Sequence, residues 1–112
     1  MESSRRPANV DFEDALDGAA QEWMRVRIWL EAGRVRRFVV QYETMIGGRR
    51  VPVVRYDTAH GYAHRDQMFR DREPIKTSLG DHLSLDDALQ IAEGDVRRNW
   101  RTYRRQFMRN QL

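Results

Sequence analysis

The sequence contains no cysteine, a single lysine and no long apolar run. Without cysteine there is no disulfide framework, and neither a thiolate metal cage nor a cysteine nucleophile can be built, which is compatible with a reducing cytosol. No segment is long and apolar enough to cross a bilayer, and the opening residues MESSRRPANVDFEDALD lack the apolar run of a signal peptide. We therefore expect a soluble, cytoplasmic protein that does not use a membrane as a partner.

Positive charge is carried almost entirely by arginine, which supplies 19 of the 20 basic residues. Residues 96–112 hold six arginines and no acid. These are Arg97, Arg98, Arg101, Arg104, Arg105 and Arg109. Such a block attracts polyanions through electrostatics that salt weakens, so we predict that the six arginines bind nucleic acid or the acidic face of a partner protein. The alternative is a solvated helix end whose charges complement the helix dipole.

The length of 112 residues allows one domain with one modest core. We predict a flexible arm over residues 1–10 and a single α+β domain over residues 11–112. The domain is expected to begin with a short helix at Asp11, because apolar residues then recur at helical spacing. These residues are Phe12, Leu16, Ala19, Ala20 and Trp23.

Three segments that follow alternate between apolar and polar residues or are rich in β-branched and aromatic residues. They are MRVRIWL (24–30), VRRFVVQYET (35–44) and RRVPVVRYD (49–57). Short connectors containing glycine join them, which predicts an antiparallel meander, and EPIKTSL could add a fourth strand. Pro52 lacks a backbone N–H, so the third strand should begin there or lie at an edge on that side.

A long amphipathic helix is expected after Ser84, which has the character of an N-cap, with Asp87 three residues later. Apolar residues then recur at steps of three and four for about 25 residues. They are Leu85, Leu89, Ala92, Val96, Trp100, Tyr103 and Phe107. We predict that this apolar stripe covers one face of the meander.

The stretch VVRYDTAHGYAHRDQ gathers ionisable residues at the end of an apolar strand. Arg55 and Asp57 are two residues apart, so their side chains should share one face, and His60 and His64 follow in a polar loop. One interpretation is a ribonuclease or phosphodiesterase site that needs no metal and no cofactor. There the histidines transfer protons, Arg55 or Arg65 stabilises the phosphorus charge and Asp57 orients a histidine.

Two other interpretations remain open for the same stretch. A divalent metal could be held by His60, His64 and either Asp57 or Asp66. Alternatively, Asp57 forms an ion pair with Arg55 or Arg65, the histidines are surface loop residues, and the whole cluster is a structural turn.

The run RYDTAHGYAHRD, which follows FVVQYET and VPVV, resembles the small bacterial TumE-type toxin family and neighbouring uncharacterised families over about residues 25–95. Those families share a short antiparallel sheet, a strand that ends in Arg-Tyr-Asp and a downstream segment with histidine. The resemblance implies a cytoplasmic toxin of a toxin–antitoxin pair. The partners expected are RNA, an antitoxin protein and a second copy of the chain. The alternative is a non-enzymatic binding module that uses its arginine-rich helix.

Overall fold

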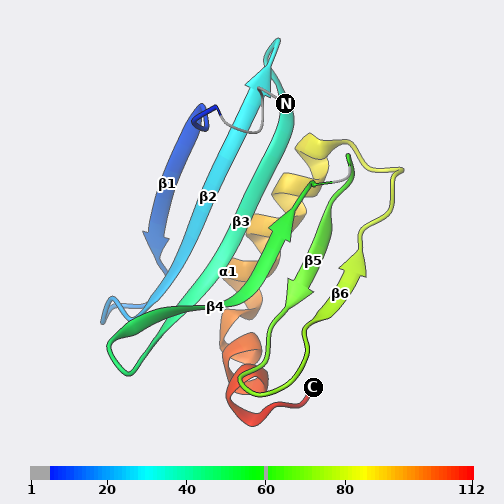
Figure 1. Ribbon diagram of the computed structural model, residues 1–112. Helices are drawn as coiled ribbons and strands as arrows, with labels where there is room; N and C mark the ends of the chain where they lie inside the picture. The colour runs from blue at the N-terminus through cyan, green and yellow to red at the C-terminus, as the bar shows by residue number, and fades with distance from the viewer. Residues whose placement is uncertain (1–5, 60) are drawn as a thin grey trace.

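A computed structural model describes residues 6–59 and 61–112 as a six-stranded antiparallel sheet with one long helix. The strands are β1 (Val10–Ala15), β2 (Glu22–Glu31), β3 (Arg34–Ile46), β4 (Arg49–Asp57), β5 (His64–Gln67) and β6 (Ile75–Ser78), and the helix is α1 (Leu85–Arg109). Each strand pairs with its neighbour in the sequence, in the order β1-β2-β3-β4-β5-β6. The helix crosses one face of the sheet, and the other face carries no helix (Figure 1). We call this second face the open face.

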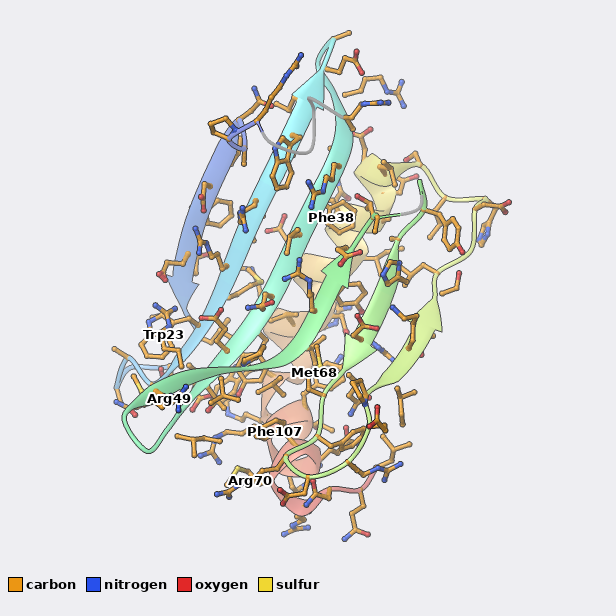
Figure 2. The ribbon with its side chains drawn as sticks, viewed as in Figure 1. Trp23, Phe38, Arg49, Met68, Arg70 and Phe107 are labelled. Atoms are coloured by element: carbon orange, nitrogen blue, oxygen red, sulfur yellow. The ribbon has the colours of Figure 1, made fainter. Side chains whose placement is uncertain are left out.

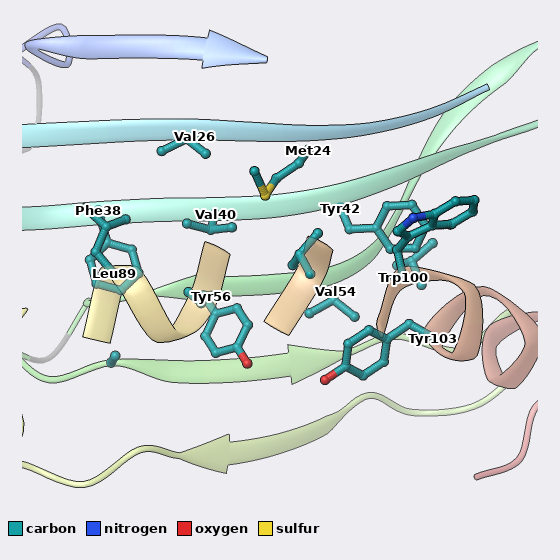
Figure 3. Packing of buried hydrophobic residues seen from close by; sticks show 14 of the residues in the cluster. Met24, Val26, Phe38, Val40, Tyr42, Val54, Tyr56, Leu89, Trp100 and Tyr103 are labelled. Carbon is teal, nitrogen blue, oxygen red and sulfur yellow. The ribbon is translucent and has the colours of Figure 1, made fainter. Parts of the chain in front are cut away.

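The core lies between α1 and the central strands (Figure 3). Phe38, Val40 and Tyr42 of β3 have no exposed surface, and Val54 and Tyr56 of β4 lie beside them, as the alternation predicts. The apolar stripe of α1 packs against these strands, and it includes Trp100 and Tyr103, which are 8% and 7% exposed. The predicted two-layer α+β arrangement is therefore confirmed.

Helix α1 begins and ends through specific capping contacts. The Ser84 hydroxyl accepts a hydrogen bond from the Asp87 N–H at 3.0 Å, which satisfies one of the free donors of the first turn. Asn110 adopts the left-handed conformation with φ of 57°, and its N–H bonds the carbonyls of Gln106 and Phe107. The resulting helix has 25 residues, as its apolar pattern indicates.

The predicted N-terminal helix is wrong, because residues 10–15 form strand β1 along the free edge of β2. Phe12 pairs with Val26 in that ladder and is 37% exposed. The helical spacing was misleading because its next apolar residues fall in the turn between β1 and β2. In this turn the Asp17 carboxylate accepts from the N–H groups of Gln21 and Glu22, a local alternative to helix that aspartate favours.

The sheet has six strands, and the prediction of three or four is wrong in number. Besides β1, the missed strand is β5, which lies in the segment taken as a polar loop. Its residues, His-Arg-Asp-Gln, include no β-branched or aromatic side chain, so the local sequence lacks a strand signal. The free backbone groups of β4 and β6 on either side supply its hydrogen-bond partners.

Pro52 lies in a part of β4 that has only one neighbouring strand. It pairs with Glu43 of β3, whereas the pairing with β5 begins at Val54. Pro52 therefore lies where β4 is an edge of the sheet, which is one of the two predicted placements. A bulge at this point shifts the register between Tyr42 and Glu43, and both Val53 and Val54 are fully buried.

Two carboxylates bind tyrosine hydroxyls where the helix meets the sheet. The Asp95 Oδ2 atom of α1 accepts from the hydroxyls of Tyr56 at 2.6 Å and Tyr103 at 2.5 Å, and Arg65 Nη1 donates to the Tyr103 hydroxyl at 3.0 Å. Burial and the adjacent Asp95 carboxylate raise the pKa of Tyr103 to about 12. In the same way, the buried Glu22 accepts from the Tyr42 hydroxyl at 2.5 Å. These bonds satisfy polar groups that would otherwise be buried without a partner.

Candidate functional site

The strand register places two rows of mostly polar side chains across the open face. One row runs through Glu13, Arg25, Gln41, Arg55, Asp66 and Lys76. The next row runs through Asp11, Arg27, Val39, Asp57, His64 and Ser78. Because side chains alternate between the two faces of a strand, both rows point away from α1. The side chains drawn in Figure 2 show this face toward the viewer, with the helix behind the sheet.

Arg55, Asp57 and His64 meet on this face, where β4 pairs with β5. Asp57 Oδ1 lies 2.9 Å from His64 Nε2, and Asp57 Oδ2 accepts from Arg55 Nε at 3.2 Å. Asp57 Oδ1 also accepts from the Ala59 N–H, and Arg55 Nη1 donates to the amide oxygen Oε1 of Gln41 at 3.0 Å. Three of the four predicted site residues are therefore brought together by cross-strand pairing.

The Asp57 carboxylate is held in its ionised form by its neighbours. Burial raises the pKa of this carboxyl, but the Ala59 N–H, the Arg55 guanidinium and the charge of His64 together outweigh burial and hold the pKa below its ordinary value. An ionised carboxylate on Nε2 fixes the orientation of the imidazole ring. The side chain of His64 is only 7% exposed, so little of the imidazole ring is accessible to a substrate.

His60, the fourth predicted site residue, lies outside the described residues. Asp66, which the metal interpretation also used, forms an ion pair with Lys76 at 3.1 Å. In residues 6–59 and 61–112 no group of three or more histidine, aspartate or glutamate side chains could hold a metal ion. The proposed metal set depends on His60, so it stays a prediction. Arg65 does not join the site, because it faces the helix and contacts Tyr103.

The six predicted nucleic-acid-binding arginines divide into two groups. Arg97 forms an ion pair with Asp14 at 2.5 Å, and Arg104 binds Glu22 at 3.4 Å, so these two hold the helix to β1 and β2. The other four form no ion pair with any described residue and lie at the helix positions most distant from the core. They are Arg98, Arg101, Arg105 and Arg109, and we call them the arginine stripe.

The arginine stripe follows from helix periodicity. At 3.6 residues per turn, positions 98, 101, 105 and 109 fall within an arc of about 80°, roughly opposite the buried stripe that contains Val96, Trp100 and Phe107. Arg101 is steadied by stacking on Trp100, with its guanidinium carbon 4.4 Å from the ring centroid.

A further group of basic residues was not identified from the sequence. Arg6, Arg36 and Arg37 line a cleft together with Trp29, at the end of the sheet where β2 passes into β3. They come from the arm before β1 and from β3, and only the fold brings them together. No spacing rule connects such positions, so the sequence contains no signal for this cleft.

No helix in residues 6–59 and 61–112 is long and apolar enough to span a membrane. Neither a curated protein nor a solved structure matches the chain. Nothing in these comparisons links it to TumE-type toxins, so that resemblance stays a prediction. One family does match, over residues 3–112, which is nearly the whole sequence. The chain therefore belongs to the family described as Domain of unknown function (DUF7718).

Proposed function

We propose that the protein binds nucleic acid, with RNA as the leading partner, through the arginine stripe of α1. The observation that supports this proposal is that four neighbouring arginines are exposed on one side of a helix without an acidic partner among the described residues. A rise of about 1.5 Å per residue spreads them over about 16 Å. A regular row of guanidinium groups of this kind matches the repeated phosphates of a nucleic-acid backbone.

The alternative, in which the arginines serve only the fold and the helix dipole, accounts for some of the six arginines and leaves the others unexplained. Arg97 and Arg104 have intramolecular partners, Asp14 and Glu22, and are explained by the fold. A single arginine near the end of a helix would be explained by the helix dipole, which acts within the last turn. Arg98 and Arg101 lie two to three turns before the end of α1 at Arg109, so the dipole does not account for them. Contacts between the arginine stripe and phosphates would bind the backbone of a nucleic acid and carry little sequence information.

The test is RNA binding by a double variant, Arg101→Gln with Arg105→Gln, compared with the wild type. Each phosphate contact contributes a slope of about 0.7 to the dependence of log affinity on log salt for a single strand, so losing two contacts should reduce the slope by about 1.4. The matched control is Arg25→Gln with Arg34→Gln, which removes the same charge from exposed positions on other elements. This control should retain most of the affinity and nearly the full slope.

Two results would contradict the proposal. One is an absence of RNA or DNA binding by the wild type at low salt. The other is an equal loss of affinity in the double variant and in its control, because net charge alone would then explain the binding.

RNA cleavage is a second candidate function, favoured by the contact between Asp57 and His64 with Arg55 beside it. An oriented imidazole can act as a general base, and a guanidinium can stabilise charge on a phosphate. Cleavage would also fit a toxin that an antitoxin protein neutralises in the cytoplasm. The burial of His64 makes binding the better supported function, because a substrate hydroxyl must come within hydrogen-bond reach of a general base.

The cleavage candidate is tested with His64→Gln, His60→Ala and Asp57→Asn. If the site is catalytic, each change should lower RNA cleavage, or toxicity on expression, by at least about a hundredfold. The melting temperature of His60→Ala should stay close to that of the wild type, because acid–base groups act on the transition state. Equal activity in all three variants would assign the cluster a structural role only.

A further inference from the structure

A cleft of about 600 Å³ opens on the protein at the end of the sheet that holds the β2–β3 hairpin. Its walls come from three segments: residues 6, 7 and 9 before β1, the adjoining ends of β2 and β3, and residues 58, 59 and 61 after β4. This volume falls within the range of about 300–1,000 Å³ that is usual for small-molecule sites. No residue of α1, which crosses one face of the sheet (Figure 1), lines the cleft.

Residues 6–9, which precede β1, are held at the cleft by two hydrogen bonds to β2. Trp29 Nε1 donates to the Arg6 carbonyl at 2.9 Å, and the Leu30 N–H donates to Asn9 Oδ1 at 2.7 Å. These contacts hold the backbone of Arg6 against the hairpin, so its side chain forms part of the cleft wall. The three segments therefore line one cleft.

Positive charge exceeds negative charge in this wall. Arg6, Arg36 and Arg37 line the cleft, and the one acidic residue among the lining side chains, Glu31, already forms an ion pair with Arg36 at 3.3 Å. Arg6 and Arg37 form no ion pair within the described part of the chain. Two guanidinium groups therefore remain available for an anion.

Arg37 is also oriented for binding. Its guanidinium carbon lies 4.4 Å from the centroid of the Trp29 ring, so the ring supports one face of the planar group. A guanidinium held in this way keeps the donors at its edge in a fixed fork, which matches two oxygens of a phosphate. The entropy lost on binding an anion is reduced accordingly.

The rest of the wall combines apolar side chains with the polar side chains of Asn9 and Thr58. Pro7, Trp29 and Leu30 contribute to it, and Leu30 is 41% exposed, which is high for a large apolar side chain. A single phosphate would fill only a small part of about 600 Å³. A ligand that uses both parts of the wall carries a phosphate and a flat, largely apolar group.

We propose that this cleft binds a nucleotide, with its phosphate on Arg6 and Arg37 and its base against Pro7, Trp29 and Leu30. The site goes beyond the helix-mediated binding proposed above and shares no residue with it. The same chemistry could be supplied by a free nucleoside monophosphate or by the phosphorylated 5′ end of an RNA strand.

The experiment is calorimetric titration of the full chain with adenosine 5′-monophosphate and with adenosine. Binding of the monophosphate at least about tenfold tighter than that of adenosine is expected, because only the monophosphate reaches the arginines. Arg37→Gln should weaken monophosphate binding by about tenfold or more. Arg34→Gln is the matched control: it removes a charge from the same hairpin but lies outside the cleft lining, so its affinity should equal that of the wild type.

Arg6→Gln is a second variant, which lies outside the sheet and leaves its packing intact, and it should weaken binding in the same way. Short RNAs with and without a 5′ phosphate identify the source of the ligand. Tighter binding of the phosphorylated RNA, lost in Arg37→Gln, assigns the site to RNA ends, whereas binding of the monophosphate alone assigns it to free nucleotides. The proposal is overturned if the monophosphate does not bind at millimolar concentration, or if Arg6→Gln and Arg37→Gln both bind it as tightly as the wild type.

Discussion

Replacement of Asp95 by asparagine should destabilise the protein by an amount that its hydrogen bonds determine. The carboxylate accepts from two buried tyrosine hydroxyls, Tyr56 and Tyr103, and from Asn99 Nδ2 at 2.7 Å. A hydrogen bond to a charged group contributes about 1.5–3 kcal/mol to stability and a neutral bond about 0.5–1.5 kcal/mol. Converting the two tyrosine bonds from charged to neutral therefore reduces the free energy of unfolding by about 2–3 kcal/mol.

The assay is urea unfolding followed by tryptophan fluorescence, since Trp100 lies on the same helix as Asp95. The midpoint should fall while the denaturant slope stays constant, and the melting temperature should fall by about 4 °C per kcal/mol. Asp11→Asn is the matched control, because it makes the same chemical change in an exposed carboxylate that pairs with Arg25. This control should leave the midpoint nearly unchanged.

A double-mutant cycle separates the tyrosine bond from other effects of the change. Asp95→Asn combined with Tyr56→Phe should show a coupling energy of at least about 1 kcal/mol, because the two groups are in direct contact. If Asp95→Asn lies within about 0.5 kcal/mol of the wild type, the reasoning about charged hydrogen bonds at this interface is refuted.

Three further predictions concern pH and packing. Tyr103 has its pKa raised from 10.0 to about 12, so the unfolded chain loses this proton first, and stability measured by urea unfolding should fall as pH rises from about 10 to about 12; Tyr103→Phe should show a shallower fall. The lowered pKa of Asp57 stabilises the fold above the unfolded value near 3.8, and this contribution is lost as pH falls through the lower folded value. Acid unfolding of Asp57→Asn should therefore lose part of its pH dependence, and an unchanged acid limb would contradict the assignment. Phe38→Ala, at a fully buried position, should reduce the free energy of unfolding by about 3–5 kcal/mol in the same urea assay.

The elements that sequence patterns predicted well are those in which burial and local geometry agree. Helix α1 has a capping residue, Ser84, and an apolar repeat that persists through Phe107, so both its start and its buried side could be predicted. Strand β3 alternates around Phe38 and Tyr42, and its buried face follows from that alternation. In these segments each residue supports the same structure as its neighbours.

The elements that were missed depend on partners distant in the sequence. Strand β5 consists of polar residues and forms because it lies between β4 and β6. The contact of Asp57 with His64 follows from that pairing, so a loop interpretation predicts the residue types of the cluster without its geometry. The cleft at Arg37 also requires residues 6–9 to lie on β2, which no local pattern indicates.

The strand order also determines how the chain folds. Every pair of strands is adjacent in the sequence, and β2 and β3 are joined by a turn of only two residues, Ala32 and Gly33. Closing such hairpins loses little chain entropy and takes about 1–10 μs, so the sheet can assemble by successive addition of neighbours. Helix α1 instead packs on β3 and β4 across a long intervening segment. The contacts between the helix and the sheet therefore join residues that are far apart in the sequence. We expect docking of the helix to limit the folding rate.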